Sequence, residues 1–436
     1  MMSIFGYVSL SVIMFVATLG GSGGAAFMFP VNLIFFGLSV RGAVAHTSLF
    51  VCISSLGRVV IELVTTWKNI KDRRINFHIV IISAPVMFLG SFIGVNLNTA
   101  SPNPVILIVM TVVLLFATYK LFVKYRSKKQ AETERELAKM DALSEDDTMD
   151  MALSNGDETV VVQIDPEGDN GNYAKVASVE VETTTAENGV IVTKQITIEN
   201  DENYIQLQMD ALDLIMLVVI FMLNPLLAFF RGTKAMESFI HNVYCTTEDI
   251  LIIGIYIVVI LVLSGFNCAR MIKRSANIED SEKQIKLTMS SITKYLGAVF
   301  VIGMMGSYIS VGMSVLFTLN LLSFGLSPFV SSPTALVLSA LTSGSSSILY
   351  LLNGQLCFIY AVIGSAIIIV FSLGTRLTLY EVIMKSGKES VLLLCLVFMI
   401  GLSIPTNLAK ILPGIIANAE KGINIWAFTS PCPSTT

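Results

Sequence analysis

The sequence has little charge and few of the side chains on which soluble catalytic sites depend. Of 436 residues only 14% are charged, and 54% are hydrophobic. The mean hydropathy of +0.74 exceeds what a water-soluble domain of this length reaches. The three histidines and six cysteines form no CxxC and no zinc-type spacing, and there is no glycine-lysine phosphate loop and no Ser-His-Asp pattern. We therefore expect an integral membrane protein that is not an enzyme, with no metal, no cofactor and no nucleic-acid partner.

Long apolar runs are present instead. A transmembrane helix needs about 20 mainly apolar residues. The run Met1–Leu19 has no basic n-region, which favours a first membrane helix over a cleaved signal peptide. The other full-length candidates are Ala43–Thr65, Ile79–Leu97, Val105–Val123, Ala211–Phe230, Ile250–Phe266, Tyr295–Ile309, Pro333–Leu352, Cys357–Leu373 and Val391–Leu408. Two runs, Ala25–Leu38 and Met313–Leu326, are too short to span comfortably. The fold class is therefore an all-α integral membrane protein of about twelve segments.

The basic residues predict the orientation, because Lys and Arg are retained on the cytosolic side of a membrane. If each short segment crosses once, four basic clusters fall on one side and both termini lie outside. Short segments that form re-entrant hairpins would change this parity. The clusters are Lys68, Lys71, Arg73 and Arg74; Lys120, Lys124, Arg126, Lys128 and Lys129; Arg270, Lys273 and Arg274; and Arg376, Lys385 and Lys388. Arg41, Arg231 and Lys234 are the exceptions.

An acidic segment of residues 127–207 is then cytosolic. Between Glu132 and Glu202 lie 19 of the 32 acidic residues. The run Ser144–Asp150 is typical of a disordered, solvated chain, because it holds too little apolar surface to offset the entropy of ordering. From Val176 to Ile198, Val/Thr/Ile alternation around Asn188-Gly189 indicates a small β hairpin.

The two membrane halves contain an internal repeat. Residues 20–56 align with residues 308–344 at an offset of 288, so that Gly24 meets Gly312, Asn32 meets Asn320 and Gly37 meets Gly325. Five segments in each half and an inserted helical hairpin give the two repeats inverted topology. The expected divisions are 1–126, the first membrane repeat; 127–207, the acidic segment; 208–290, the inserted hairpin and a basic linker; 291–408, the second membrane repeat; and 409–436, a C-terminal tail.

Matching short, glycine-interrupted segments in inverted repeats point to a substrate site at the bilayer midplane. A broken helix frees backbone N–H and C=O groups, which are tolerated in a membrane where they line a cavity. Half-helix N-termini also carry partial positive charge, which suits anions. Small residues that serve only close helix packing are the alternative.

Several stretches resemble the TauE/SafE family of sulfite exporters and sulfonate transporters. Gly20–Gly24 followed by Met28-Phe29-Pro30 is similar to its glycine-rich opening, and Ala43–Ser48 to its "A-A-T-S" stretch. Ser83–Asn98 resembles "QPMLMLGISIGVAFN" of the eukaryotic branch, and Gly325–Ala335 resembles "GIPPQVSSATA". The region Gly306–Gly312 has fewer glycines than the family pattern. The resemblance implies a membrane transporter of a sulfite- or organosulfonate-like anion.

Such an anion needs hydrogen-bond donors, which recur at corresponding places in the two halves. Arg58 could neutralise the substrate, or it could pair with Glu62 four residues on. His46 could carry a coupling proton, or it could make a structural hydrogen bond at a helix end. The candidate substrate-binding residues are Gly23, Gly24, Asn32, Thr47, Ser48, Arg58, Gly312, Asn320, Ser332, Thr334, Thr342 and Ser343.

The sequence thus predicts a secondary transporter with alternating access at the repeat interface, in the plasma membrane or an internal organelle. Its expected partners are a small anion, the lipid bilayer and a coupling proton. The alternative is a non-transporting membrane receptor or scaffold that acts through the acidic segment. Deleting that segment distinguishes the two hypotheses.

Overall fold

The computed structural model describes residues 2–19, 24–65, 75–153, 184–186, 189–191, 211–232, 236, 238–239, 246–276, 289–310, 313–324, 326 and 328–375, and parts of 394–428. The helices of the first half are α1 (Met2–Leu19), α2 (Ala25–Ile34), α3 (Val40–Thr65), α4 (Phe77–Ala100) and α5 (Asn103–Leu153). Next come α6 (Ala211–Arg231) and α7 (Thr247–Ala276). The second half contains α8 (Met289–Ile309), α9 (Met313–Ser323), α10 (Pro328–Leu352) and α11 (Phe358–Thr375), and residues 400–409 are also helical.

Eight of the described helices, α3 to α8, α10 and α11, are long and apolar enough to cross a membrane. They coincide with eight of the nine runs from Ala43–Thr65 to Val391–Leu408, whereas the expected first membrane helix, Met1–Leu19, is not among the eight. The ninth, Val391–Leu408, lies partly outside the described residues. The shorter apolar helices include α9 and the stretch Ile4–Phe15 of α1. The expected all-helical, multi-pass membrane architecture is therefore confirmed.

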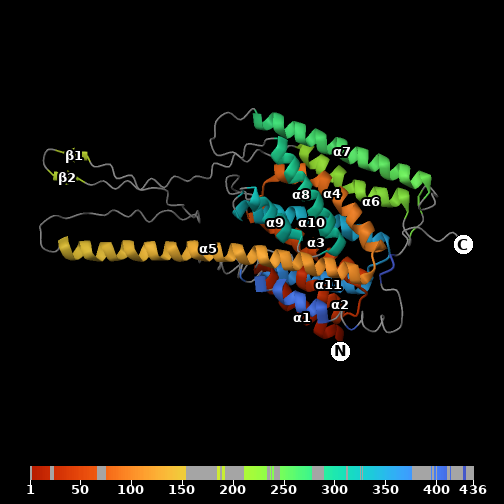
Figure 1. The fold of residues 1–436 in the computed structure, drawn as a ribbon, viewed down its shortest axis with the longest axis horizontal. Coiled ribbons are helices and arrows are strands. Elements are labelled where there is room, and N and C mark those ends of the chain that lie inside the picture. The colour runs from red at the N-terminus through yellow and green to blue at the C-terminus, as the bar shows by residue number, and fades with distance from the viewer. Residues whose placement is uncertain are drawn as a thin grey trace. The chain divides into compact units, whose positions relative to one another are not determined.

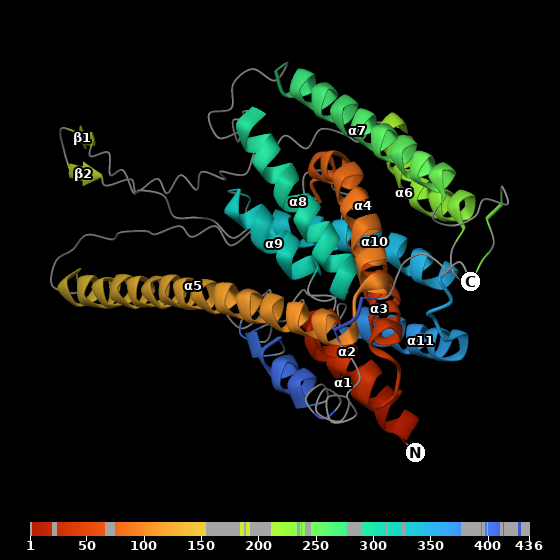
Figure 2. The ribbon, with the colours of Figure 1, turned by 45° about the vertical axis from the view of Figure 1, so that its right-hand side comes forward.

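The membrane helices belong to one compact unit, residues 1–134 and 208–436. Its inner helices are α4 and α10, whose apolar windows are 78% and 72% buried, against 22% for α7 and 28% for α11. The outer helices expose large apolar side chains such as Ile250 and Val262 of α7, as expected for surfaces that face lipid. Figures 1 and 2 show α6 and α7 side by side, and α7 packs along α4.

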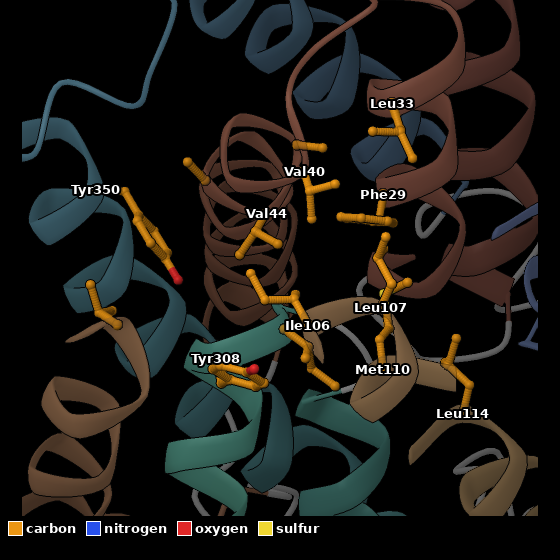
Figure 3. Packing of buried hydrophobic residues seen from close by; sticks show 14 of the residues in the cluster. Phe29, Leu33, Val40, Val44, Ile106, Leu107, Met110, Leu114, Tyr308 and Tyr350 are labelled. Atoms are coloured by element: carbon orange, nitrogen blue, oxygen red, sulfur yellow. The ribbon is translucent and has the colours of Figure 1, made fainter. Parts of the chain in front are cut away.

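One part of the core joins the two halves directly. In Figure 3, side chains of α2, α3 and α5 belong to one buried cluster with Tyr308 of α8 and Tyr350 of α10. The hydroxyl of Tyr350 donates a hydrogen bond of 2.6 Å to the Ser307 carbonyl oxygen, so this buried phenol is satisfied. The labelled residues from the first half are Phe29, Leu33, Val40, Val44, Ile106, Leu107, Met110 and Leu114.

Glycines bring α4 and α8 into backbone contact. A Cβ atom at Gly90 would lie 2.4 Å from the Phe300 carbonyl oxygen, and one at Gly94 would lie 2.2 Å from that of Met304. On the α8 side, a Cβ at Gly303 would lie 2.6 Å from the carbonyl oxygen of Met87. Gly90 and Gly94 are four residues apart and share one helix face, the small-xxx-small arrangement that lets membrane helices approach closely. Close packing is therefore the role of these two glycines.

Two ion pairs connect α6 and α7, one near each end of the helical hairpin that these helices form. Arg231 Nε lies 2.6 Å from Asp249 Oδ1, and Arg270 Nη1 lies 2.8 Å from Asp213 Oδ1. Asp213 lies in the first turn of α6 and is only 3% exposed, so it is a buried member of an ion pair and not a solvated helix-start residue. The pairing also accounts for Arg231 as an exception to the orientation rule, because Asp249 neutralises it.

The second compact unit comprises Arg135–Leu207. It contains the C-terminal part of α5, which continues to Leu153 and makes the run Ser144–Asp150 helical where the sequence indicates disorder. Ala, Leu, Glu, Lys and Met dominate residues 131–143, and these strong helix formers extend the helix. Two short strands, β1 (Thr184–Ala186) and β2 (Gly189–Ile191), pair antiparallel within the stretch where a hairpin is expected.

Candidate functional site: the interface of α3 and α10

Helices α3 and α10, one from each half of the chain, pack against each other in opposite directions. Near the start of α3, a Cβ at Gly42 would lie 3.7 Å from the Gln355 carbonyl oxygen, beyond the end of α10. At the middle, Ser48 Oγ donates to the Ser343 carbonyl oxygen at 3.2 Å. Beyond the end of α3, Asn76 N donates to Thr334 Oγ1 at 2.9 Å. The predicted residues Ser48 and Ser343 thus meet at the α3–α10 interface, whereas Thr334 accepts its hydrogen bond from the N-cap residue of α4.

Four hydroxyls on α10, those of Thr342, Ser343, Ser346 and Ser347, donate to carbonyls of their own helix. Thr342 Oγ1 donates to the Leu338 carbonyl oxygen at 2.7 Å, and Ser347 Oγ donates to that of Ser343 at 2.6 Å. Backbone carbonyls are the usual acceptors for Ser and Thr inside membrane helices. A hydroxyl that is buried here without such a partner is therefore unusual.

A second polar cluster joins three helices behind this interface. The hydroxyls of Ser91 in α4, Ser307 in α8 and Ser346 in α10 are mutually hydrogen bonded, with oxygen distances of 2.7 to 3.0 Å. All three side chains are fully buried. Each hydroxyl has partners in the other two, so this cluster is suited to holding the helices in register.

The predicted amides take different environments in the two halves. Asn32 Nδ2 donates to Thr47 Oγ1 at 3.0 Å, and both side chains are buried. The buried Asn320 Nδ2 has no hydrogen-bond partner in the described part of the chain, although its residue is partly exposed. Ser332 is also only partly buried. The two asparagines that the sequence pairs therefore differ in their hydrogen bonding.

Left-handed residues mark the breaks before the two short helices. Gly24 precedes α2 with a φ of 70°, which glycine adopts without strain. Ser310, which lies between α8 and α9, has a φ of 52°. A non-glycine residue in this region costs about 1–3 kcal/mol and is enriched at functional sites. Gly23 and Gly312 lie outside the described residues.

Arg58 lies within the membrane-spanning part of α3. Its side chain is 2% exposed, and Nε donates to the Ser54 carbonyl oxygen at 3.4 Å. Glu62, one turn further on, is 7% exposed. Both charged side chains are thus buried, and both hypotheses for Arg58 remain compatible with its position.

His46 of α3 is hydrogen bonded to Cys357, in the segment that precedes α11. Its Nδ1 lies 2.8 Å from the Gly42 carbonyl oxygen, and its Nε2 lies 3.1 Å from the Cys357 backbone nitrogen, which donates to it. We assign the Nδ1–H tautomer from these partners. The Cys357 carbonyl oxygen lies 3.3 Å from the same Nε2, so both the structural and the proton-carrying hypotheses for His46 are compatible with its contacts.

Asn224 of α6 connects the inserted hairpin to the two inner helices. Its Nδ2 donates to Ser345 Oγ of α10 at 2.7 Å and to the Phe88 carbonyl oxygen of α4 at 3.3 Å. Its Oδ1 accepts a hydrogen bond from the Tyr256 hydroxyl of α7. The sequence reading did not find this residue, although an asparagine inside an apolar run and before Pro225 is a signal that could have been used.

We predict that Asn224→Leu destabilises the protein by about 2–3 kcal/mol, because it leaves the Tyr256 and Ser345 hydroxyls buried without their partner. Thermal unfolding of the purified protein in detergent measures the effect. The control is Thr118→Val in α5, whose hydroxyl bonds only to its own helix at Leu114. Equal unfolding temperatures for the two variants would contradict the structural role of Asn224.

Among the described residues, no cluster of three His, Cys, Asp or Glu side chains could hold a metal ion. Eight apolar spanning helices with buried hydroxyls and amides at their inner contacts define a multi-pass integral membrane protein. The chain also matches proteins of one named family.

The model of the sulfite exporter TauE/SafE family matches residues 6–144. Sulfite exporter TauE/SafE family protein 5 of Arabidopsis thaliana is 22% identical over 400 residues, which cover 85% of this chain and 80% of the relative. Family protein 1 of the same plant is 23% identical over 417 residues, covering 94% and 82%. No solved structure matches the chain. These matches confirm the resemblance to the TauE/SafE family, whose members are transporters rather than enzymes.

Proposed function

We propose that the chain is a secondary transporter of a small sulfite- or organosulfonate-like anion, with alternating access at the interface of α3 and α10. The relatives are named as sulfite exporters, and their similarity extends over both membrane halves. The observation that carries the proposal is the direct contact of α3 with α10, with Ser48 bonded to Ser343 at the middle of both helices.

The contacts between helices support a two-repeat mechanism. In the first half α2 packs on α3, and in the second half α9 packs on α10. Across the halves, α4 packs on both α8 and α10, while α11 packs on both α1 and α3. Each of these contacts has a counterpart at the corresponding position of the other half. Such a pairing is what inverted repeats need if one half is to rock against the other.

The scaffold hypothesis makes a different prediction for the acidic segment. We expect that replacing residues 132–202 with a short Gly/Ser linker leaves anion flux in proteoliposomes within about twofold of the full chain, because Arg135–Leu207 forms a separate compact unit. Labelled sulfite and taurine are the probes. Flux in neither protein would favour the scaffold, and its loss only on deletion would assign the segment an essential part in transport.

A further inference from the structure

Two buried serines of α3 and α10 have hydroxyls without a hydrogen-bond partner among the described residues. Ser55 in α3 and Ser339 in α10 are both fully buried. Neither hydroxyl has a hydrogen-bond partner in the part of the chain that the structure describes. By contrast, Thr342 and Ser347 on α10 bond to carbonyls of their own helix. Native structures rarely leave buried hydroxyls in this state, and a ligand is one of the standard explanations.

The register of the helices places both serines at the same interface. Ser48, Cys52 and Ser55 follow one face of α3 at i, i+4 and i+7, while Ser339 and Ser343 follow one face of α10. Ser48 contacts Ser343, and a Cβ at Gly344 would lie 3.2 Å from Cys52 Sγ. Ser55 lies two turns beyond Ser48 on α3, and Ser339 lies one turn before Ser343 on α10. Because the helices run in opposite directions, both serines lie on the same side of the Ser48–Ser343 contact.

A basic side chain lies near this position. Arg58 is one turn beyond Ser55, its side chain is 2% exposed, and its Nε donates to the Ser54 carbonyl oxygen. Ser55 is the sixteenth of the 26 residues of α3, and Ser339 is the twelfth of the 25 residues of α10, so both lie near the middle of a spanning helix. Two free hydroxyl donors and a nearby cation in a water-poor interior suit an anion with several acceptor oxygens.

We propose that Ser55 and Ser339 donate hydrogen bonds to a single bound oxyanion, sulfite- or sulfonate-like, at the midpoint of the α3–α10 interface, with Arg58 as its counter-charge. This inference rests on the proposed transport function and specifies its binding site. It adds two residues from opposite repeats to the candidates indicated by the sequence. Alternating access would then expose this pair of donors first to one side of the membrane and then to the other.

Binding can be measured separately from transport. The full chain is purified in detergent, and its unfolding temperature is recorded against sulfite, sulfate or taurine at constant ionic strength, with chloride as the reference anion. We expect saturable stabilisation of the wild type by at least one of the three. In Ser55→Ala/Ser339→Ala the half-saturating concentration should rise tenfold or more for each lost hydroxyl, in line with hydrogen bonds to a charged group.

The unfolding temperature without anion distinguishes a binding role of Ser55 and Ser339 from a structural role. Removing two unsatisfied hydroxyls should leave the anion-free unfolding temperature of the double variant unchanged or raise it. The control is Ser54→Ala, whose hydroxyl is hydrogen bonded to Ser372 of α11 at 3.4 Å. That variant should unfold at a lower temperature and keep wild-type anion affinity.

Unchanged anion affinity in the double variant would overturn the assignment of the two serines, and transport would then use another site. The absence of stabilisation by every anion would overturn it as well. Binding that depends on the serines in a protein without flux would support the site and contradict the proposed transport. The two proposals can therefore fail separately.

Discussion

Replacing Gly94 with leucine is expected to prevent α4 and α8 from packing and to abolish the folded membrane unit. A Cβ at this position would lie 2.2 Å from the Met304 carbonyl oxygen and 3.0 Å from the Tyr308 nitrogen. Both are backbone atoms, so no side chain can rotate away, and the helices would have to separate. Overpacking a close contact costs about 1–3 kcal/mol for side chains that can adjust. A rigid backbone contact and a full leucine should exceed that range.

The measurement is the yield of monodisperse protein on size exclusion and its unfolding temperature in detergent. Gly297→Leu is the matched control, because this glycine lies in the same helix pair, in α8, and has nothing within 4 Å of its Cβ position. The control should behave as the wild type. If Gly94→Leu also ran as a stable monodisperse protein, α4 and α8 would not be in backbone contact.

Arg231→Met is expected to destabilise the protein by about 3–5 kcal/mol, the usual cost of leaving one member of a buried ion pair without the other. The side chain of Asp249 is 2% exposed and that of Arg231 is 12% exposed, so little water can compensate for the lost partner. Arg231 also donates to Asn96 Oδ1 at 3.3 Å, which links the hairpin to α4. Unfolding temperature and denaturant midpoint in detergent report the loss.

A double-mutant cycle separates the ion pair from these other contacts. Asp249→Leu alone should be strongly destabilised as well. Arg231→Met/Asp249→Leu should recover a large part of the lost stability, because neither charge of this pair is then left buried without the other. Additive effects of the two single changes would show that Arg231 and Asp249 act independently, contrary to the 2.6 Å contact between them.

Hydropathy was sufficient to locate the membrane helices. In a bilayer the backbone must satisfy its own hydrogen bonds, so long apolar runs have little choice but to form helices. This is why eight of the nine runs from Ala43–Thr65 to Val391–Leu408 reappear as spanning helices within a few residues of their expected ends. Sequence reasoning failed for Ser144–Asp150, where composition indicated disorder although the preceding helix-forming residues extend α5 through it.

The candidate site was only partly accessible from the sequence. The sequence placed Ser48 and Ser343 among the candidate hydrogen-bond donors of the two halves, and the structure joins them directly. The pairing of Asp213 with Arg270 could not be read in the same way, because its members are far apart in the chain and meet only when α6 packs on α7. The hydroxyls of Ser55 and Ser339 could not be identified from the sequence either. They are serines like their neighbours, and only the structure shows that they lack a hydrogen-bond partner among the described residues.

Flux across a sealed membrane tests the central claim most directly. Proteoliposomes that contain the full chain are assayed for uptake and efflux of labelled sulfite and taurine, with and without a proton gradient, beside Asn32→Ala/Asn320→Ala. We predict saturable flux in the wild type and a fall of about tenfold or more in the variant, which loses amides at corresponding positions of both repeats. Correctly folded protein that moves neither anion would contradict the account.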